Sequence, residues 1–282
     1  MPIDRRLFLK ASGLAAAGSS LFNEIVKAIG SFGPIDINCM IGPSNRIPSA
    51  HELPEQLFSD LDYYGIEAAL AYHSYARFVS VETGNALIAK VSKETSRIRP
   101  CWVAFPSPAE ISDAEAWVDR MRTAGVRALR IFPGHRDPNT FGLSLSEWIF
   151  GPLLRALEMR RVPLLVERPL VEWDEIATLL KTYPSLPFVL LGAHFGESRQ
   201  IYEILRTSQN VFLGTSRLLL FNGLQDLVGR FGANRLLFDS GLPEFDPSMP
   251  LSLIYYSRLT DEQKGLILRG NFERLWKEAY GR

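Results

Sequence analysis

Carboxylate and imidazole side chains stand at the ends of several short apolar runs in this sequence. Glu167 closes one such run, and His194 and Asp239 follow two others. A carboxyl group and an imidazole that lie close together can act as general acid and general base, or can bind a divalent metal. Glu167, His194 and Asp239 are therefore the candidates for catalytic residues.

A second group of side chains could position a substrate. Arg130 lies near the end of an apolar run, Arg168 follows Glu167 directly, and Arg217 follows another run. Each guanidinium can neutralise a carboxylate or bind an acidic substrate through two parallel hydrogen bonds. A loop histidine can act as an acid or a base near neutral pH. The predicted substrate-binding residues are Asn38, His73, Arg130, His135, Arg168 and Arg217.

These residues need a scaffold that brings the ends of the apolar runs together. Short aliphatic runs alternate with amphipathic runs from residue 33 onward, which indicates a parallel sheet covered by helices. The predicted strands are Ile35 to Met40, Ala68 to His73, Ile98 to Phe105, Val126 to Phe132, Val162 to Glu167, Phe188 to Gly192, Val211 to Gly214 and Arg235 to Asp239. Eight strands close a (β/α)8 barrel, whose active site lies at the carboxyl ends of the strands.

Composition limits the kind of partner. The chain has 282 residues, 46% of them apolar, and 31 basic residues balance 31 acidic ones. This suits one large domain, residues 33 to 282, and gives no field of one sign that would attract nucleic acid. Cys39 and Cys101 both lie in apolar runs, so we expect buried thiols and not a disulfide. A small molecule is the expected partner, and the oligomeric state is left open.

Residues 1 to 32 differ from the rest of the chain. Asp4-Arg5-Arg6-Leu7-Phe8-Leu9-Lys10 is followed by a weakly apolar run of small residues, which matches a twin-arginine export signal. We expect a periplasmic or secreted protein. An amphipathic N-terminal helix is the alternative, and an uncleaved signal at the membrane stays open. No other stretch approaches the roughly 20 consecutive apolar residues that a membrane span requires.

Several motifs resemble those of the amidohydrolase-related family of TIM barrels, over about residues 33 to 279. In that family a His-x-His motif on the first strand ligates a catalytic metal, and here the two histidine places hold Asn38 and Met40. The segment Ala193-His194-Phe195-Gly196 is similar to the family's Ala-His-Leu-Gly. The closing segment Lys264 to Leu275, with Gly-Asn before a last helix, is also similar. The resemblance implies a single α/β TIM barrel with an extra C-terminal helix.

The same resemblance implies an altered or absent metal site. Glu167 takes the place of a histidine ligand, and Gly241 takes the place of the catalytic aspartate, with Asp239 two residues earlier. His194 stands where the family has a histidine that binds metal or polarises the substrate. If strand side chains alternate regularly, Asp36 and Asp239 also point into the barrel. The expected inward set is Asp36, Asn38, Glu167, His194 and Asp239.

This set is rich in oxygen and has one imidazole, so it suits Mg or Mn better than Zn. If a metal is bound, we predict Asp36, Glu167 and His194 as its ligands. Without a metal, two buried carboxylates raise each other's pKa, and one can stay protonated as a general acid.

Structural roles for the same residues remain open. Asp36 can accept hydrogen bonds from loop backbone, Asp239 can cap the following turn, and Glu167 can pair with Arg168. His194 can be a satisfied core residue, and His73 and His135 can be ordinary loop residues.

Two functions follow from these predictions. The first is an exported amidohydrolase-related enzyme, either a hydrolase of an amide, ester or lactone, or a carbon-carbon lyase such as a decarboxylase. The second is a barrel that binds a small carbohydrate or acid without catalysis. Fold alone does not choose between the two.

Overall fold

The computed structural model describes residues 23–24, 27–28, 31–43, 51–106, 111–134, 143–219 and 222–281. Residues 1–22 of the predicted export segment, and His135, lie outside these ranges. No helix within them is both long enough and apolar enough to cross a membrane.

Parallel strands form the centre of the molecule, in the orders β1-β2-β3 and β4-β5-β6-β7-β8-β9. Within each group, every strand pairs with the next one along the chain, as repeated right-handed βα units require. Their bounds are β1 Ile35–Ile41, β2 Ala68–His73, β3 Ile98–Pro100, β4 Trp102–Val103, β5 Leu129–Ile131, β6 Leu164–Glu167, β7 Phe188–Leu191, β8 Val211–Gly214 and β9 Leu236–Leu237.

Backbone hydrogen bonds connect the two groups of strands into one ring. Cys101, between β3 and β4, donates to Ala71 of β2 at 2.8 Å, and Trp102 donates to Ala128 before β5 at 3.2 Å. On the other side, Ile37 of β1 donates to Phe238, just after β9, at 3.2 Å. The predicted strand from Ile98 to Phe105 therefore exists as two short pieces that bridge β2 and β5.

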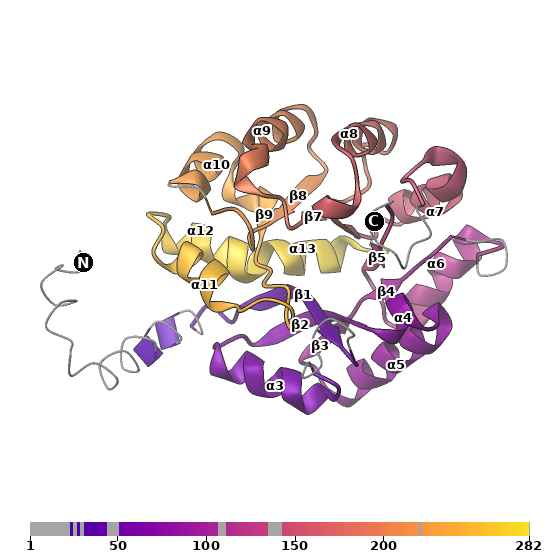
Figure 1. Cartoon of the computed structure of the whole chain (residues 1–282), viewed down its shortest axis with the longest axis horizontal. Helices are drawn as coiled ribbons and strands as arrows, with labels where there is room; N and C mark the ends of the chain where they lie inside the picture. Colours follow the sequence, from indigo (N-terminus) through magenta and orange to yellow (C-terminus); the bar gives the residue numbers. More distant parts are fainter. Residues whose placement is uncertain are drawn as a thin grey trace, which may run out of the picture.

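Helices surround these strands (Figure 1). They are α3 Pro54–Tyr63, α4 Tyr75–Phe78, α5 Val81–Glu94, α6 Ala114–Thr123, α7 Glu147–Met159, α8 Trp173–Thr182, α9 Ser198–Thr207, α10 Gly223–Phe231, α11 Ser248–Tyr255, α12 Asp261–Gly265 and α13 Asn271–Glu278. Their apolar faces pack on the sheet: Ile201, Ile204 and Leu205 of α9 are buried, for example. This is the layered core of a TIM barrel, so the predicted fold class is confirmed.

The predicted C-terminal helix covers the end of the barrel where the strands begin. Phe272 and Leu275 of α13 belong to the same buried cluster as Ile35 and Ala68, the first residues of β1 and β2. Arg127, just before β5, donates to the carbonyl of Ala279 at 2.9 Å. α13 does not cover the opposite end of the barrel, where the strands finish and where a barrel of this kind has its active site.

A register shift interrupts β1 between Asp36 and Cys39. Ile35, Ile37 and Met40 share one buried cluster, whereas Cys39 and Ile41 belong to the other. A bulge of this kind changes which face each side chain takes. The expected regular alternation of Asp36, Asn38 and Met40 is therefore wrong, and Asp36 does not share the inward face.

Candidate functional site

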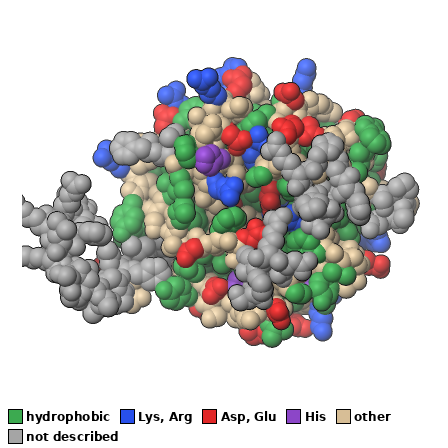
Figure 2. Space-filling view, viewed as in Figure 1, with side chains coloured by type: hydrophobic (Ala, Val, Ile, Leu, Met, Phe, Trp, Pro, Cys, Tyr) green, Lys and Arg blue, Asp and Glu red, His purple; other side chains and the backbone are tan. Residues whose placement is uncertain are grey.

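A pocket of about 360 Å³ lies at the carboxyl ends of the strands. Its lining combines charged and polar groups with aromatic and aliphatic ones. The polar residues are Asn38, Arg77, Arg130, Glu167, Ser216, Arg217 and Glu244, and the apolar ones include Met40, Tyr72, Leu170, Leu191 and Phe245. Basic and acidic side chains gather with hydrophobic ones near the centre of the face that Figure 2 shows.

Arg130 of β5 is the most constrained of these groups. It is 2% exposed. One guanidinium nitrogen donates to Asn38 Oδ1 at 2.6 Å, and another forms a short ion pair with Glu167. The carbon between them lies 4.8 Å from the ring centre of Tyr72 and 4.9 Å from that of Phe132. Partners on three sides hold this positive charge in one place.

Asn38 carries the connection across to a buried carboxylate. Its amide nitrogen donates to Asp239 Oδ2 at 3.4 Å. Asp239 also accepts from the Ser216 backbone N–H and from the Ser216 hydroxyl, both at 2.8 Å. We call Glu167, Arg130, Asn38, Asp239 and Ser216 the polar chain, because each is hydrogen-bonded to the next.

Gly214, the last residue of β8, makes room for the carboxylate. A Cβ atom at this position would lie 2.5 Å from Asp239 Oδ1. The small residue therefore lets the end of β8 and the segment after β9 approach closely enough for Asp239 to reach Ser216.

Burial sets the protonation of Asp239. Its side chain is fully buried, and burial, with a smaller contribution from the charge of Asp36, raises the pKa of Asp239 to about 6. Hydrogen bonds from Ser216 and Asn38 act in the opposite direction. The group thus exchanges a proton close to neutral pH, as a general acid or base must.

Asp36 has the structural role that the sequence left open. Its carboxylate accepts from the backbone N–H groups of Asn38 and Ser240, each at 3.0 Å, and from the Ser240 hydroxyl. It is fully buried, does not line the pocket, and burial raises its pKa. Asp36 therefore ties β1 to the segment after β9.

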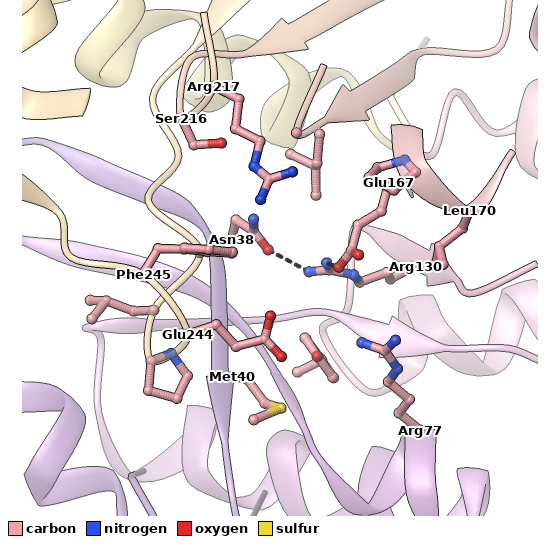
Figure 3. Close-up of a pocket in the computed structure, with 17 residues that line it drawn as sticks. Asn38, Met40, Arg77, Arg130, Glu167, Leu170, Ser216, Arg217, Glu244 and Phe245 are labelled. Atoms are coloured by element: carbon pink, nitrogen blue, oxygen red, sulfur yellow. Dashed lines mark hydrogen bonds and ion pairs between the residues drawn. The ribbon is translucent and has the colours of Figure 1, made fainter. Parts of the chain in front are cut away.

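Two further guanidinium groups face the pocket. Arg77 of α4 is buried and lies 4.1 Å from the ring centre of Phe132. Arg217, after β8, is exposed and lies 5.1 Å from the ring centre of Phe245. Figure 3 shows the two on opposite sides of the pocket, with Arg130 and Glu167 between them. A bound anion would meet positive charge from several directions.

Three predicted residues lie away from the pocket. His194 is exposed, and its ring accepts from the Gly196 backbone N–H at 3.0 Å, so it caps the short helix η2 Phe195–Glu197. Arg168 pairs with Glu197 at 2.7 Å, and Glu167 pairs with Arg130. The ion pair between Glu167 and Arg168 that the sequence left open is therefore not the one that forms. His73 accepts from the Tyr75 N–H at 3.1 Å. None of the three is among the residues that line the pocket.

Ser216, Arg77 and Glu244 line the pocket but were not among the predicted site residues. Ser216 comes two residues after the last residue of β8, so the rule that strand ends deliver chemistry could have found it. Arg77 lies on a four-residue helix after β2, and Glu244 lies in the loop after β9. In such short segments sequence periodicity does not predict the direction in which a side chain points.

Comparisons with known proteins bear on the fold. No protein-family model matches the sequence, and no curated protein matches it. Solved structures do match. An uncharacterized TIM-barrel protein from Bordetella bronchiseptica has a TM-score of 0.68 at 19% identity, over 88% of this chain and 99% of that one. A structure of an amidohydrolase II has a TM-score of 0.67 at 15% identity, over 86% and 99%.

A third match is 5-carboxyvanillate decarboxylase from Novosphingobium aromaticivorans, in complex with manganese and 4-hydroxy-3-methoxy-5-nitrobenzoic acid. Its TM-score is 0.68 at 16% identity, over 88% of this chain and 97% of that one. The chain has the fold of the amidohydrolase-related TIM barrels.

The residues at this site do not fit a divalent metal. Asn38 Oδ1 and Glu167 already bind the guanidinium of Arg130. A metal cation bound by the same two side chains would therefore be repelled by the positive charge of Arg130. Asp36, Glu167 and His194, the predicted metal ligands, are not brought together. Among the described residues no group of three or more His, Cys, Asp or Glu side chains is placed to hold a metal.

Proposed function

We propose that this protein is an enzyme that decarboxylates a small, planar carboxylic acid, with Arg130 as the fixed positive charge at the reacting centre. The observation that carries the proposal is the polar chain at the mouth of the barrel, where a buried guanidinium is held between Asn38 and Glu167. The decarboxylase with the same fold, named above, supports the reaction class.

Charge in the pocket favours an acid. Among the lining residues that the structure describes, Arg77, Arg130 and Arg217 supply three positive charges against the two negative charges of Glu167 and Glu244, an excess of one. This excess is local, since the whole chain is neutral by formal count. Arginine binds carboxylates through paired, charge-assisted hydrogen bonds.

Shape favours a flat substrate of one ring. Tyr72 and Phe245 offer aromatic surfaces, and Leu170 and Leu191 offer aliphatic ones, within about 360 Å³. Apolar walls with a few placed polar groups are typical of small-molecule sites.

The chemistry follows from these groups. When the bond between the substrate and its carboxyl carbon breaks, CO₂ leaves and the electron pair stays on the substrate. A nearby substrate oxygen that takes up this negative charge would be stabilised by the preorganised guanidinium of Arg130. A proton must then replace CO₂ on the substrate carbon.

The alternative is a barrel that binds an acid without converting it. One observation favours it: His194, the predicted catalytic histidine, is exposed and engaged as a helix cap, and within the described ranges no histidine lines the pocket. The two proposals agree on the ligand and differ on turnover.

Incubation with hydroxybenzoic acids, beside their methyl esters and primary amides, separates the possibilities. We expect one CO₂ per acid consumed, with the esters and amides unchanged. Hydrolysis of the esters or amides would contradict decarboxylation, and binding of acids without CO₂ release would favour the binding barrel.

Arg217→Met should weaken acid binding about tenfold or more. The matched control Arg206→Met, on the surface of α9 and paired with Glu203, should leave acid binding unchanged.

We also propose export through the twin-arginine route, on the strength of Arg5 and Arg6 and the apolar run that follows. A fusion of the first 40 or so residues to a folded reporter should be translocated. Translocation that survives replacement of both arginines by lysine would contradict the route.

A further inference from the structure

Two aspartate-serine pairs in this barrel have the same local geometry. Ser216 donates its backbone N–H and its hydroxyl to Asp239, both at 2.8 Å. Ser240 donates its backbone N–H, at 3.0 Å, and its hydroxyl to Asp36. Both carboxylates are fully buried. The pairs differ in surroundings, because Ser216 lines the pocket, whereas Ser240 does not and is 1% exposed.

Asp239 is joined to the pocket by only two side chains among the described residues. Asn38 donates to it at 3.4 Å and Ser216 at 2.8 Å, and no ion pair to Asp239 occurs within that part of the chain. The Asn38 amide donates but does not release its proton at ordinary pH, whereas a hydroxyl can accept one proton while it gives another. Ser216 is therefore the side chain through which a proton could pass between Asp239 and the pocket.

We propose that Ser216 and Asp239 form a proton relay that delivers the proton replacing CO₂ on the substrate. This inference rests on the proposed decarboxylation. When Asp239 is protonated, its O–H donates to Ser216 Oγ, the reverse of the hydrogen bond that the carboxylate accepts, and the Ser216 hydroxyl is free to turn to the substrate. Asp239 then gives its proton to Ser216 Oγ while the Ser216 hydroxyl gives its own to the substrate carbon. The O–H bond of Asp239 breaks, one O–H bond breaks and one forms at the serine, and a C–H bond forms on the product. After CO₂ and the product leave, the Asp239 carboxylate regains a proton from solvent in the pocket through Ser216.

The electrostatic surroundings agree with this role. The burial that raises the pKa of Asp239 to about 6 leaves both protonation states accessible near neutrality. The charged groups around it are Asp36 of β1, which favours the protonated form, and Arg130 of β5, which is separated from it by Asn38. Cys39 of β1, a neighbouring thiol, stays protonated because burial and the two aspartates raise its pKa.

The test compares Ser216→Ala, Ser216→Thr and Asp239→Asn with the matched control Ser240→Ala. We expect Ser216→Ala and Asp239→Asn to lower kcat about 100-fold or more, while affinity for an unreactive acid changes less than about threefold. Ser216→Thr keeps a hydroxyl and should retain most of the activity. Ser240→Ala should keep kcat, because Ser240 does not touch the pocket.

The pH profile and the isotope provide a second readout. Asp239 must be protonated to donate, so wild-type kcat should fall as pH rises above about 6. The residual kcat of Asp239→Asn should not show this fall. Two protons move together in the relay, so kcat plotted against the deuterium fraction of the solvent should be curved for wild type and linear for Ser216→Ala.

Three outcomes would overturn the relay. If the wild-type protein releases CO₂ and Ser216→Ala does so equally fast, the relay is wrong and the proposed function stands. If Ser240→Ala loses as much kcat as Ser216→Ala, the effect is structural. If the wild-type protein releases CO₂ from none of the acids, the proposed function fails and the relay fails with it.

Discussion

Both polar atoms of the Asn38 side chain take part in the polar chain. Its carbonyl oxygen accepts from Arg130, and its amide nitrogen donates to Asp239. A carboxylate of the same size would keep the first contact and turn the second into repulsion. Asn38 thus orients an arginine and a buried acid at the same time.

We therefore expect Asn38→Asp to lower the free energy of unfolding by about 2 kcal/mol at pH 8. The loss should become smaller at pH 4, where Asp239 is protonated. Asn38→Ala should show a loss that varies little with pH. Urea unfolding at both pH values measures this, and an Asn38→Asp variant as stable as wild type at pH 8 would contradict the link to Asp239.

Asp239 also makes stability depend on pH. Its pKa rises from 3.8 to about 6 in the fold, so the folded state holds the proton more tightly than the unfolded chain does. Its contribution to stability is fully present below about pH 4 and is lost as pH rises to about 6. The loss amounts to about 3 kcal/mol.

The Asp239→Asn variant should lack this contribution. Urea unfolding of both proteins from pH 4 to 8 should show wild type losing stability relative to the variant between pH 4 and 6. No further change in the difference is expected above that range. Parallel curves over the whole range would show that Asp239 titrates normally.

At the residue scale, the sequence predicted some of the residues that line the pocket. Asn38, Arg130, Glu167 and Arg217 line the pocket as expected, because strand ends converge in this fold. His194 does not, because the chain turns at Gly192, with φ of 66°, and the imidazole caps the next helix. A motif fixes the position of a residue along the chain, but the loop conformation decides where its side chain points.

At the scale of elements, the short helix α4 holds Arg77 beside the pocket by packing against α5. A Cβ atom at Gly84 of α5 would lie 2.0 Å from the backbone nitrogen of Ala76 in α4. The glycine is therefore required by close contact between two helices. Nothing in the sequence periodicity reveals this contact, because α4 has only four residues.

We expect Gly84→Ala to push α4 outward, lower the free energy of unfolding by about 2 to 3 kcal/mol, and weaken acid binding. Gly229→Ala in α10 is the matched control, since nothing lies within 4 Å of its added Cβ atom. It should be neutral or stabilising by up to about 1 kcal/mol. Chemical denaturation and acid titration of both variants measure this; equal behaviour would contradict the packing argument.

Elements were predicted better where the apolar pattern was regular. The strands β2 and β8 have the predicted bounds, whereas β3 and β4 divide one predicted strand at Cys101. In β1 the register shift after Asp36 defeats the alternation rule and removes Asp36 from the inward set. Bulges depend on tertiary contacts that a sequence pattern does not record.

At the scale of the whole molecule, a neutral chain carries a pocket whose described lining residues have an excess of positive charge. The barrel fold could be predicted because alternating apolar and amphipathic runs leave few other ways to bury the surface. The nature of the site could not, because no sequence pattern records that Asn38 and Glu167 both bind the buried guanidinium of Arg130.

The most direct test of this account is CO₂ release from hydroxybenzoic acids by protein treated with a chelator and assayed with and without added Mn²⁺. We expect CO₂ release that is unchanged by the chelator or by Mn²⁺ and is lost in Arg130→Met. CO₂ release that appears only with added metal, or that persists in Arg130→Met, would contradict the account.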